Sequence, residues 1–328
     1  MGFLSSSIDR IRISAIGTYI PAGRVANAER LSEFGLQEDF LRTKLGVVTR
    51  ALKSPDEDTS DLCVKAFADL TAQVAVSLSD VQLCCVVTQN PDRGIPHCAA
   101  IVHHKLGLAR SCMTFDLSQG CAGYVHGLAL VSSLMTSLRL QQALLFTCDP
   151  YSKIINPADK NTALIFGDAA SVTYLQRDGA GYALIDASFG TEPGSSACLT
   201  LDSAHGQDGQ GPRLHMDGAA VLYHATRLIP ANLRELLERN QLSLAQIDRF
   251  LLHPGSLRVV ELIRKDLKLS PDKVPFEIEH YGNTVSSSIP LLFKPYVREQ
   301  RCQRLVLSGF GVGFSWGSCI AELRPAGS

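Results

Sequence analysis

Short apolar runs alternate along this chain with longer stretches in which apolar residues recur every three or four positions. The runs have the length of buried strands, and the periodic stretches predict amphipathic helices. Turn-rich segments separate these strands and helices, and the longest such segment is a polar surface loop at 190–213. The predicted strands lie at 11–17, 82–88, 143–147, 171–175, 182–188 and 250–252, and the predicted helices at 29–42, 61–76, 98–106 and 124–135. This alternation is typical of an α/β fold.

The segment 115–135 has the most distinctive local pattern. Its apolar start predicts a buried strand that ends at Gln119-Gly120, and a helical pattern begins at Tyr124. Cys121 therefore stands at a tight turn between glycines, where a substrate can approach the backbone closely. Because a helix N-terminus favours a thiolate, we expect Cys121 to be a nucleophile and the one cysteine of ten with a lowered pKa. A small, buried and unreactive cysteine is the alternative.

The second half of the chain repeats the pattern of the first half. The segments 78–90, 120–121 and 143–150 correspond to 244–255, 282–283 and 304–311. The offsets between their first residues are 166, 162 and 161 residues (244 − 78, 282 − 120 and 304 − 143). A nearly constant offset over three consecutive elements predicts two homologous halves related by a pseudo-two-fold axis.

A duplicated α/β fold brings the polar strand ends of its halves together. We divide the chain into residues 1–175, which carry Cys121, and residues 176–328, which carry His253 and Asn283. All three residues lie at strand ends or helix starts, where ligands bind in α/β folds. Singly, His253 can equally be a surface or core histidine, and Asn283 a helix cap or turn residue. Together they favour a Cys-His-Asn active site.

Composition excludes other classes of function. The chain has 328 residues, of which 45% are apolar and 19% charged, and this predicts a well-packed soluble protein. The net charge of −1 argues against nucleic-acid binding. Because no apolar run has the length of a membrane span and no signal-peptide pattern is present, we expect a cytoplasmic protein without a membrane partner. Residues 1–6 fit the short myristoylation pattern, although a disordered tail has the same composition.

The cysteines and histidines lack the spacing of a metal site. The ten cysteines include no C-x-x-C pair, and most stand in apolar runs, which indicates free buried thiols in a reducing compartment. His97, His103 and His104 also lack ligand spacing and fit a surface role. We therefore expect no metal.

Six segments of the chain match one pattern: Thr43-Lys44-Leu45-Gly46, Gly120-Cys121-Ala122-Gly123, Ile165-Phe166-Gly167-Asp168-Ala169, Leu251-Leu252-His253, Tyr281-Gly282-Asn283-Thr284 and Gly309-Phe310-Gly311-Val312-Gly313-Phe314-Ser315-Trp316-Gly317. Together they resemble the β-ketoacyl-ACP synthase III family of the thiolase superfamily. The resemblance extends from Ile13 to Leu323. It implies a thiolase-like α/β fold, in which two pseudo-two-fold-related βαβαβαββ halves form a five-layered α-β-α-β-α core. Asparagine at position 283, instead of a second histidine, favours type III over the elongating synthases.

The resemblance implies a decarboxylative Claisen condensation. Cys121 would take an acyl group from an acyl-CoA or acyl-carrier-protein thioester, with the backbone N–H groups of Cys121 and Val312 as the oxyanion hole. His253 and Asn283 would stabilise the enolate that forms when a malonyl thioester loses CO2, and this enolate would give a 3-oxoacyl product. The implied partners are these thioesters, an acyl carrier protein and a second copy of the chain in a homodimer. CoA and phosphopantetheine thioesters are substrates in this scheme, and no cofactor stays bound.

The positions that contact CoA in the family differ here. Phe40 stands in place of a stacking tryptophan, although a core phenylalanine fits it equally well. Lys44 and Lys160 replace arginines, so planar stacking and bidentate contacts are lost. Arg258 is retained near the tunnel mouth, where the resemblance implies a carrier-protein contact. Whether CoA or a carrier protein delivers the acyl group stays open.

Further departures indicate a specialised branch. The Pro-Gly-Ser sequence at 254–256 resembles type III polyketide synthases, and Val312 replaces a glycine, which requires a negative φ. In the family, the loop 90–96 of one subunit caps the tunnel of the other, with Ile95 at the gate. Arg93 in this loop could bind a carboxylated acyl chain, as in the branch that makes biotin precursors, although a solvated arginine fits the same position.

Two alternatives to a condensing enzyme stay open. One is an acyltransferase that passes the Cys-bound acyl group to an amine, a hydroxyl or a β-keto thioester, with pyrone formation as one case. The other is a non-catalytic partner subunit, which the presence of Cys121, His253 and Asn283 disfavours. The acyl chain, the extender unit and the pathway stay open as well.

Overall fold

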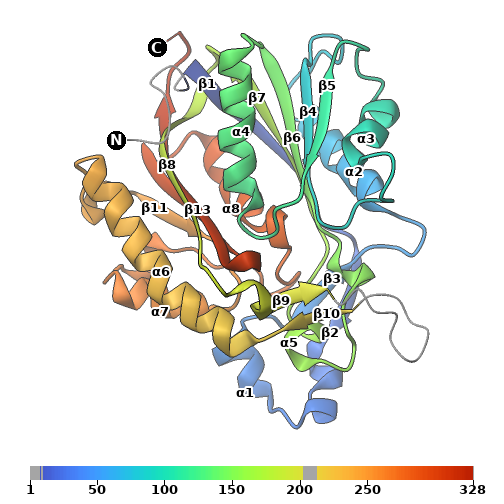
Figure 1. Cartoon of the computed structure of the whole chain (residues 1–328), viewed down its shortest axis with the longest axis vertical. Helices are drawn as coiled ribbons and strands as arrows, with labels where there is room; N and C mark the ends of the chain where they lie inside the picture. Colours follow the sequence, from blue (N-terminus) through green and yellow to red (C-terminus); the bar gives the residue numbers. More distant parts are fainter. Residues whose placement is uncertain (1–7, 9, 202–212, 328) are drawn as a thin grey trace.

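The computed structural model of the chain describes residue 8 and residues 10–201 and 213–327 (Figure 1). The myristoylation pattern at residues 1–6 lies outside the described residues, and so do residues 202–212 of the predicted polar loop. The strands are β1 (Ile11–Tyr19), β2 (Gly23–Ala26), β3 (Thr49–Leu52), β4 (Leu83–Val87), β5 (Met113–Leu117), β6 (Gln142–Cys148), β7 (Ala170–Arg177), β8 (Gly181–Thr191), β9 (Leu199–Leu201), β10 (Leu214–Met216), β11 (Arg249–Leu252), β12 (Arg304–Gly311) and β13 (Ser315–Arg324). The α-helices are α1 (Glu38–Phe40), α2 (Thr59–Thr71), α3 (Cys98–Leu106), α4 (Gly123–Ser137), α5 (Lys160–Ala163), α6 (Gly218–Arg239), α7 (Leu257–Asp266) and α8 (Ser288–Glu299).

The nine-stranded sheet, in the order β11-β12-β13-β8-β1-β7-β6-β4-β5, contains one strand arrangement twice. In the first copy β4 runs parallel to β6, β6 antiparallel to β7, and β7 antiparallel to β1. In the second copy β11 runs parallel to β12, β12 antiparallel to β13, and β13 antiparallel to β8. A short antiparallel contact between β1 and β8 joins the two copies. The repeat in the sequence is therefore a repeat of strand topology, while the division between residues 175 and 176 stays a prediction.

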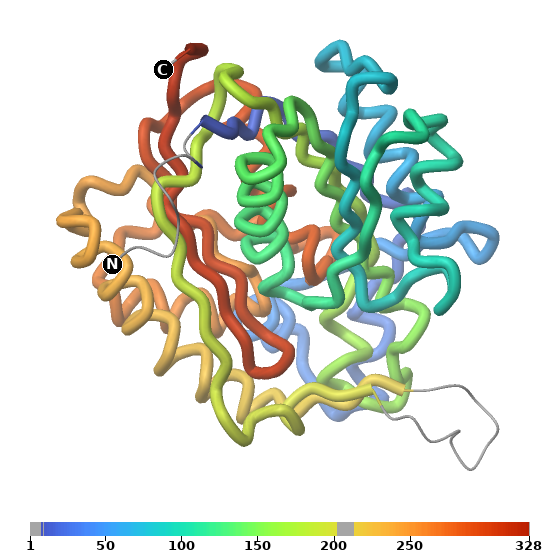
Figure 2. The backbone as a smooth tube through the Cα atoms, turned by 45° about the horizontal axis from the view of Figure 1, so that its top comes forward, coloured from blue at the N-terminus to red at the C-terminus, as the bar shows by residue number. Residues whose placement is uncertain are grey.

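Helices lie in three layers around this sheet. α4 and α8 are central, because each contacts strands of both copies: β4, β6, β12 and β13 for α4, and β1, β7, β11 and β12 for α8. α2 and α3 cover the outer face of the first copy, and α6 and α7 lie on the outer side of the second copy (Figure 1). The predicted α-β-α-β-α layering is confirmed. Figure 2 shows how β8 and β13, far apart in the sequence, run side by side between the outer and central helices.

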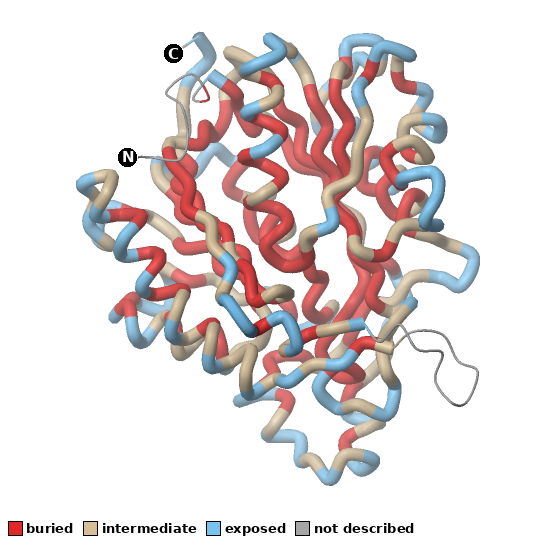
Figure 3. The backbone as a smooth tube through the Cα atoms, viewed as in Figure 1, coloured by how far each residue is buried: buried red, intermediate tan, exposed pale blue. Residues whose placement is uncertain are grey.

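Each space between the layers is filled by an apolar cluster. The central cluster packs Tyr124 and Leu128 of α4 against Phe293 of α8 and the strands of both copies. A second cluster lies under α2 and α3, and a third under α6 and α7. Burying one large apolar side chain in such a cluster contributes about 1.5–3 kcal/mol. Figure 3 shows that the buried backbone follows these strands and α4.

Carboxylates fix the starts of two outer helices. Asp58 accepts a hydrogen bond from the Thr59 N–H at 2.8 Å in the capping box of α2. Asp116 accepts hydrogen bonds from the Cys98 and Ala99 N–H groups at 2.6 and 2.8 Å, at the start of α3. By contrast, no side chain caps the start of α4 among the described residues. The positive end of the α4 dipole therefore faces the turn that carries Cys121.

Several predicted elements differ from the structure. The strand before Cys121 was expected to be buried, but β5 is the edge of the sheet, and its Met113 is 43% exposed. Apolar composition cannot distinguish an edge strand from a central one, because both have an apolar face. The predicted helix at 29–42 is a series of short turns, since Gly35 has a left-handed φ of 63°. No helix among the described residues is long and apolar enough to cross a membrane.

Candidate active site

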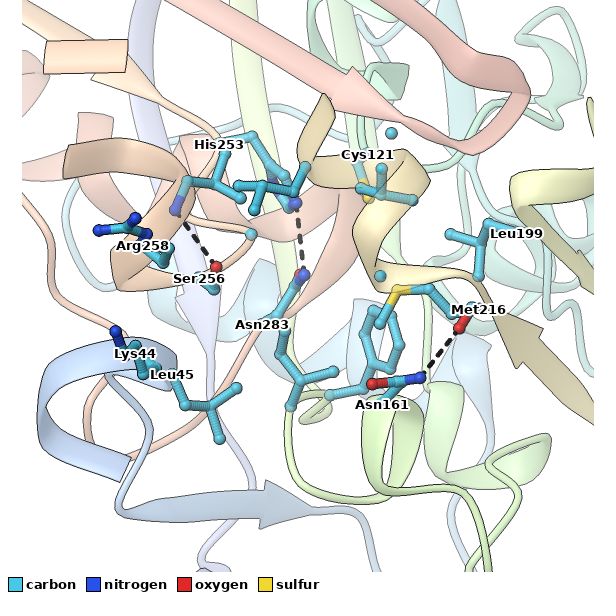
Figure 4. Close-up of a pocket in the computed structure, with 18 of the residues that line it drawn as sticks. Lys44, Leu45, Cys121, Asn161, Leu199, Met216, His253, Ser256, Arg258 and Asn283 are labelled. Carbon is cyan, nitrogen blue, oxygen red and sulfur yellow. Dashed lines mark hydrogen bonds between the residues drawn. The ribbon is translucent and has the colours of Figure 1, made fainter. Parts of the chain in front are cut away.

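Cys121, His253 and Asn283 come from three separate elements and line one cavity of about 240 Å³ (Figure 4). Cys121 precedes the central helix α4, Asn283 precedes the turn that leads into the central helix α8, and His253 follows β11. Cys121 and Asn283 therefore occupy equivalent places in the two copies of the fold. The three side chains are 4%, 2% and 3% exposed for Cys121, His253 and Asn283. All three residues are therefore buried.

The backbone of Asn283 is held against the first half of the chain. Its N–H donates to the Ile165 carbonyl at 2.8 Å, and its carbonyl accepts from the Gly167 N–H at 2.9 Å. The preceding Gly282 has a φ of +84°, and a Cβ at this position would lie 2.9 Å from the Ile165 carbonyl oxygen. Only glycine fits this close approach without strain.

The side chain of Asn283 has a fixed orientation. Its Oδ1 accepts a hydrogen bond from the Val285 N–H at 2.8 Å, and its Nδ2 lies 3.4 Å from Nε2 of His253. Val285 has a φ of 53°, a left-handed conformation that costs a β-branched residue about 1–3 kcal/mol. Because Oδ1 is occupied, the N–H2 end of the amide faces the cavity.

His253 is a neutral imidazole. Burial lowers its pKa to about 3. Its ring stands edge-on to Phe310, with the ring centroids 5.7 Å apart, and its Nδ1 has no hydrogen-bond partner among the described residues. A neutral ring donates one hydrogen bond and accepts one. His253 can therefore accept a proton or donate a hydrogen bond to a substrate oxygen at this site.

The pKa of Cys121 differs from the expectation. Burial, followed by the charge of Asp149, raises it to about 12, while the backbone N–H groups of Cys121 and Val312 lower it in part. The prediction of a lowered pKa is wrong, because desolvation of the thiolate outweighs the effect of the helix start. The resting thiol therefore keeps its proton at neutral pH.

The turn after β12 closely approaches this thiol. A Cβ at Gly311 would lie 2.9 Å from Sγ of Cys121, so only glycine permits the contact. The next residue, Val312, is not among the described residues with a positive φ. It therefore has the negative φ that a valine in place of glycine requires at this turn. Its N–H and that of Cys121 both face Sγ. The two N–H groups therefore stabilise negative charge at Sγ.

Two further residues near Cys121, Asp149 and Tyr151, were missed from the sequence. Asp149 is fully buried at the end of β6 and accepts hydrogen bonds from the Gln89 N–H at 2.6 Å and the Ser286 hydroxyl at 2.5 Å. Burial raises its pKa to about 6. Tyr151, placed by its pattern in a polar loop, is 2% exposed and donates to Oε1 of Gln89 at 2.8 Å. The criterion of a polar residue at a strand end, which identified His253, would also have identified Asp149.

The mouth of the cavity is positively charged and its interior is apolar. The cavity lining includes Phe40 and the exposed residues Lys44, Lys160 and Arg258. Figure 4 shows Lys44 and Arg258 together on one side of the cavity, across from Leu199 and Met216. The interior is lined by apolar side chains that include Ile165, Phe166, Leu199 and Met216. Such a cavity fits a long ligand with an anionic outer end and an apolar inner end.

The two predicted gate residues lie outside this cavity. Ile95 is 89% exposed, and Arg93 is exposed as well. Neither residue lines the cavity of its own chain. A gate role for them would require a second copy of the chain.

All ten cysteines are free thiols, and eight of them are buried. No group of His, Cys, Asp and Glu side chains within the described ranges is arranged to hold a metal ion.

Both halves of the chain match one protein family. Residues 115–193 match the family described as 3-oxoacyl-[acyl-carrier-protein (ACP)] synthase III, and residues 237–323 match its C-terminal part. A β-ketoacyl-[acyl-carrier-protein] synthase III of Neisseria gonorrhoeae is 30% identical over 327 residues, which cover 95% of this chain and 98% of the relative. The protein of the same name from Streptococcus sanguinis is 30% identical over 322 residues, with 95% and 99% coverage.

Solved structures give the same result. The synthase III of Thermus thermophilus superposes with a TM-score of 0.87 at 30% identity, over 96% of this chain and 100% of that chain. The priming β-ketosynthase of the R1128 polyketide pathway superposes with a TM-score of 0.87 at 25% identity, over 97% of each chain. Cys121 lies in the first matched segment, and His253 and Asn283 lie in the second.

Proposed function

Because this chain belongs to the β-ketoacyl-[acyl-carrier-protein] synthase III family and is therefore an acyl-transferring condensing enzyme, we propose that Cys121, His253 and Asn283 carry out its reaction. The observation that supports this assignment is that the three buried side chains, from both halves of the fold, line one cavity. The reaction divides into acyl transfer to Cys121 and condensation with a malonyl thioester.

In the acyl-transfer step, Sγ of Cys121 attacks the carbonyl carbon of an acyl thioester. The thiol proton moves to the neutral imidazole of His253 only as Sγ attacks, because the burial that lowers the pKa of His253 to about 3 disfavours a lasting imidazolium. The developing oxyanion takes hydrogen bonds from the N–H groups of Cys121 and Val312. The C–S bond of the donor then breaks, and the departing thiolate takes up the proton to leave as CoA or phosphopantetheine thiol.

In the condensation step, Nδ2 of Asn283 and Nε2 of His253 donate hydrogen bonds to the carbonyl oxygen of a malonyl thioester. The bond to the carboxylate breaks, CO2 leaves, and the electron pair forms an enolate that these donors stabilise. The enolate carbon attacks the acyl carbonyl on Cys121, the C–S bond breaks as the 3-oxoacyl product forms, and the Cys121 thiolate takes up a proton from water. The Asn283 amide suits this step because it donates without offering a base that would protonate the carbanion.

The charged mouth indicates how the thioesters are held. Lys44, Lys160 and Arg258 would contact the phosphates of CoA or of a carrier protein's phosphopantetheine arm. Because lysines act as point charges rather than bidentate partners, these contacts are less demanding in geometry than arginine contacts. We therefore propose that both CoA and carrier-protein thioesters are accepted. Gly255 and Ser256 line the same cavity, and we propose that this segment marks a specialised branch in fatty acid or polyketide biosynthesis.

We also propose that the chain acts as a homodimer in the cytoplasm. β5 leaves one edge of the sheet open, and an unpaired edge with an exposed apolar residue such as Met113 invites strand pairing. In a dimer, Ile95 and Arg93 would complete the cavity of the neighbouring subunit. Free thiols at all ten cysteines fit a reducing compartment. An active monomer in light scattering at micromolar concentration would contradict the dimer.

Intact mass spectrometry tests the assignment of function. Incubation with acyl-CoA should add one acyl group to the wild-type chain, and peptide mapping should place it on Cys121. Addition of malonyl thioester should then release CO2 and yield the 3-oxoacyl product. A Cys302→Ala variant, which changes a half-buried thiol, is the matched control and should behave like the wild type. An acyl adduct that reacts with amines or hydroxyls but never releases CO2 would favour the acyltransferase alternative.

A further inference from the structure

We propose that Asp149 and Ser286 form a positioning pair that holds the turn after Asn283 against the end of β6 and so fixes the Asn283 amide for condensation. Neither Asp149 nor Ser286 is among the residues that line the cavity, so the pair acts through Asn283 rather than on the substrate. The inference rests on the proposed role of Asn283 and identifies what keeps that side chain in place.

The pair joins the two halves of the chain in the protein interior. The Ser286 hydroxyl donates to Oδ2 of Asp149 at 2.5 Å, and Ser286 and Asp149 are 1% and 0% exposed. The other carboxylate oxygen, Oδ1, accepts from the Gln89 N–H at 2.6 Å. Burial raises the pKa of Asp149 only to about 6, so the carboxylate is mainly ionised at neutral pH. Because a hydrogen bond to an ionised group is stronger than one between neutral groups, Asp149 holds Ser286 firmly.

The turn that this bond holds has a strained backbone. Val285, which precedes Ser286, has a left-handed φ of 53°, and its N–H donates to Oδ1 of Asn283 at 2.8 Å. The orientation of the Asn283 amide therefore depends on the backbone conformation of Val285. A β-branched residue keeps such a conformation only where the surrounding contacts impose it.

Ser287 gives the turn a second contact with β6. Its hydroxyl oxygen lies 3.0 Å from the Thr147 carbonyl oxygen and 2.9 Å from the Thr147 hydroxyl oxygen. Thr147 lies on β6, two residues before Asp149. Two consecutive serines directly after Val285 are thus bonded to the end of one strand, and these contacts impose the left-handed conformation.

The charge of Asp149 has a separate effect on Cys121. After burial, it is the second cause that raises the pKa of this thiol. Asp149 therefore favours condensation through Asn283, while it disfavours a thiolate at Cys121. A residue that served only the stability of the fold would not have opposite effects on these two groups.

Ser286→Ala is the mildest test, because it removes only one hydroxyl. Condensation should slow by about ten- to a hundredfold, the effect of misplacing a group at the reacting centre. Acylation of Cys121 should keep the wild-type rate, since it does not need the Asn283 amide. Acetyl-, hexanoyl- and decanoyl-CoA serve as acyl donors and malonyl-CoA as the extender. Quenched-flow intact mass spectrometry follows acylation, and CO2 release follows condensation.

Ser318→Ala is the matched control. Ser318 is also fully buried, and its hydroxyl oxygen lies 2.8 Å from that of Ser308, between β12 and β13. The control should leave both rates unchanged, and this separates the loss of the bond to Asp149 from the loss of any buried hydroxyl.

Asp149→Asn tests the charge. The amide can keep a neutral hydrogen bond to Ser286, so condensation should slow less than in Ser286→Ala. Alkylation of Cys121 by iodoacetamide at mildly alkaline pH should become about two- to tenfold faster, because a neighbouring negative charge is removed. Peptide mapping should confine this increase to Cys121 among the eight buried cysteines, since a general loosening of the fold would expose the others as well.

The Asn283→Ala background decides whether the pair acts through the amide. In this background Ser286→Ala should not slow condensation further, because changes that act through one group are not additive. If folded Ser286→Ala condenses at the wild-type rate, slows acylation as much as condensation, or still slows condensation in the Asn283→Ala background, the positioning pair is wrong and the proposed function stands. If Asn283→Ala alone leaves condensation intact, or if no donor modifies the wild type, the proposed function fails, and the inference fails with it.

Discussion

The regions around Cys121 and Asn283 occupy the same place in two copies of one strand arrangement, yet their local construction differs. Cys121 lies in a turn without a left-handed residue, and the pKa of its thiol depends on desolvation and on backbone N–H groups. Asn283 lies between Gly282 and Val285, which both have left-handed φ values, and a backbone donor fixes its amide. The duplicated fold thus supplies equivalent positions before its two central helices. The immediate neighbours decide whether such a position holds a desolvated thiol or an amide of fixed orientation.

Removal of the nucleophile should have the largest effect. Cys121→Ala should form no acyl adduct, because no other residue of the site can form the thioester. Release of CO2 from a malonyl thioester should persist, since His253 and Asn283 remain. Intact mass and CO2 release measure the two activities. An acyl adduct on the variant would place the nucleophile elsewhere.

Removal of the amide should separate the two half-reactions. Asn283→Ala should form the acyl adduct near the wild-type rate and condense more slowly by about 10²–10³, the usual effect of losing one preorganised donor. His253→Ala should slow both steps, because His253 also accepts the thiol proton. Quenched acylation and CO2 release are followed in parallel. Loss of acylation with intact decarboxylation in Asn283→Ala would contradict the division of roles.

The alkylation of Cys121 should depend steeply on pH. Because its pKa is raised to about 12, the thiol is protonated below that value and loses its proton only as the pH rises towards it. Its labelling by iodoacetamide should therefore increase about tenfold per pH unit between neutral pH and mildly alkaline pH. His253, with a pKa of about 3, stays neutral over this interval and should add no inflection. A plateau in the labelling rate near neutral pH would indicate a stable thiolate.

Two glycine variants should measure the strain before Asn283. Gly282→Ala and Gly107→Ala both place alanine at a positive φ, but only the Gly282 variant brings its Cβ against backbone atoms, because nothing lies within 4 Å at Gly107. Gly107→Ala should lower the free energy of unfolding by about 1–2 kcal/mol. Gly282→Ala should lower it further and also slow condensation more than acylation. Denaturant unfolding and the two rate assays check this, and equal losses in both variants would contradict the close-contact explanation.

The fold class and family could be predicted from the sequence because their signals are local and repeated. Strand-length apolar runs, helical periodicity and a nearly constant offset do not depend on long-range packing, and the α/β fold with two related halves is confirmed. Membership of the synthase III family, predicted from several short motifs, is also confirmed. The sequence pattern also predicts that Cys121, His253 and Asn283 lie at strand ends and helix starts. In the structure all three line one cavity. Their catalytic roles stay predictions.

The tertiary structure alone decided the environment of these residues. The pKa of Cys121 depends on how fully distant segments remove the thiol from water, and no local pattern contains that information. In the same way, the position of β5 at the sheet edge follows from strand order rather than from its composition. The contact of Tyr151 with Gln89 joins residues 62 positions apart. Such contacts form only when the sheet, the central helices and the loops pack together, which is why no local pattern in the sequence shows them.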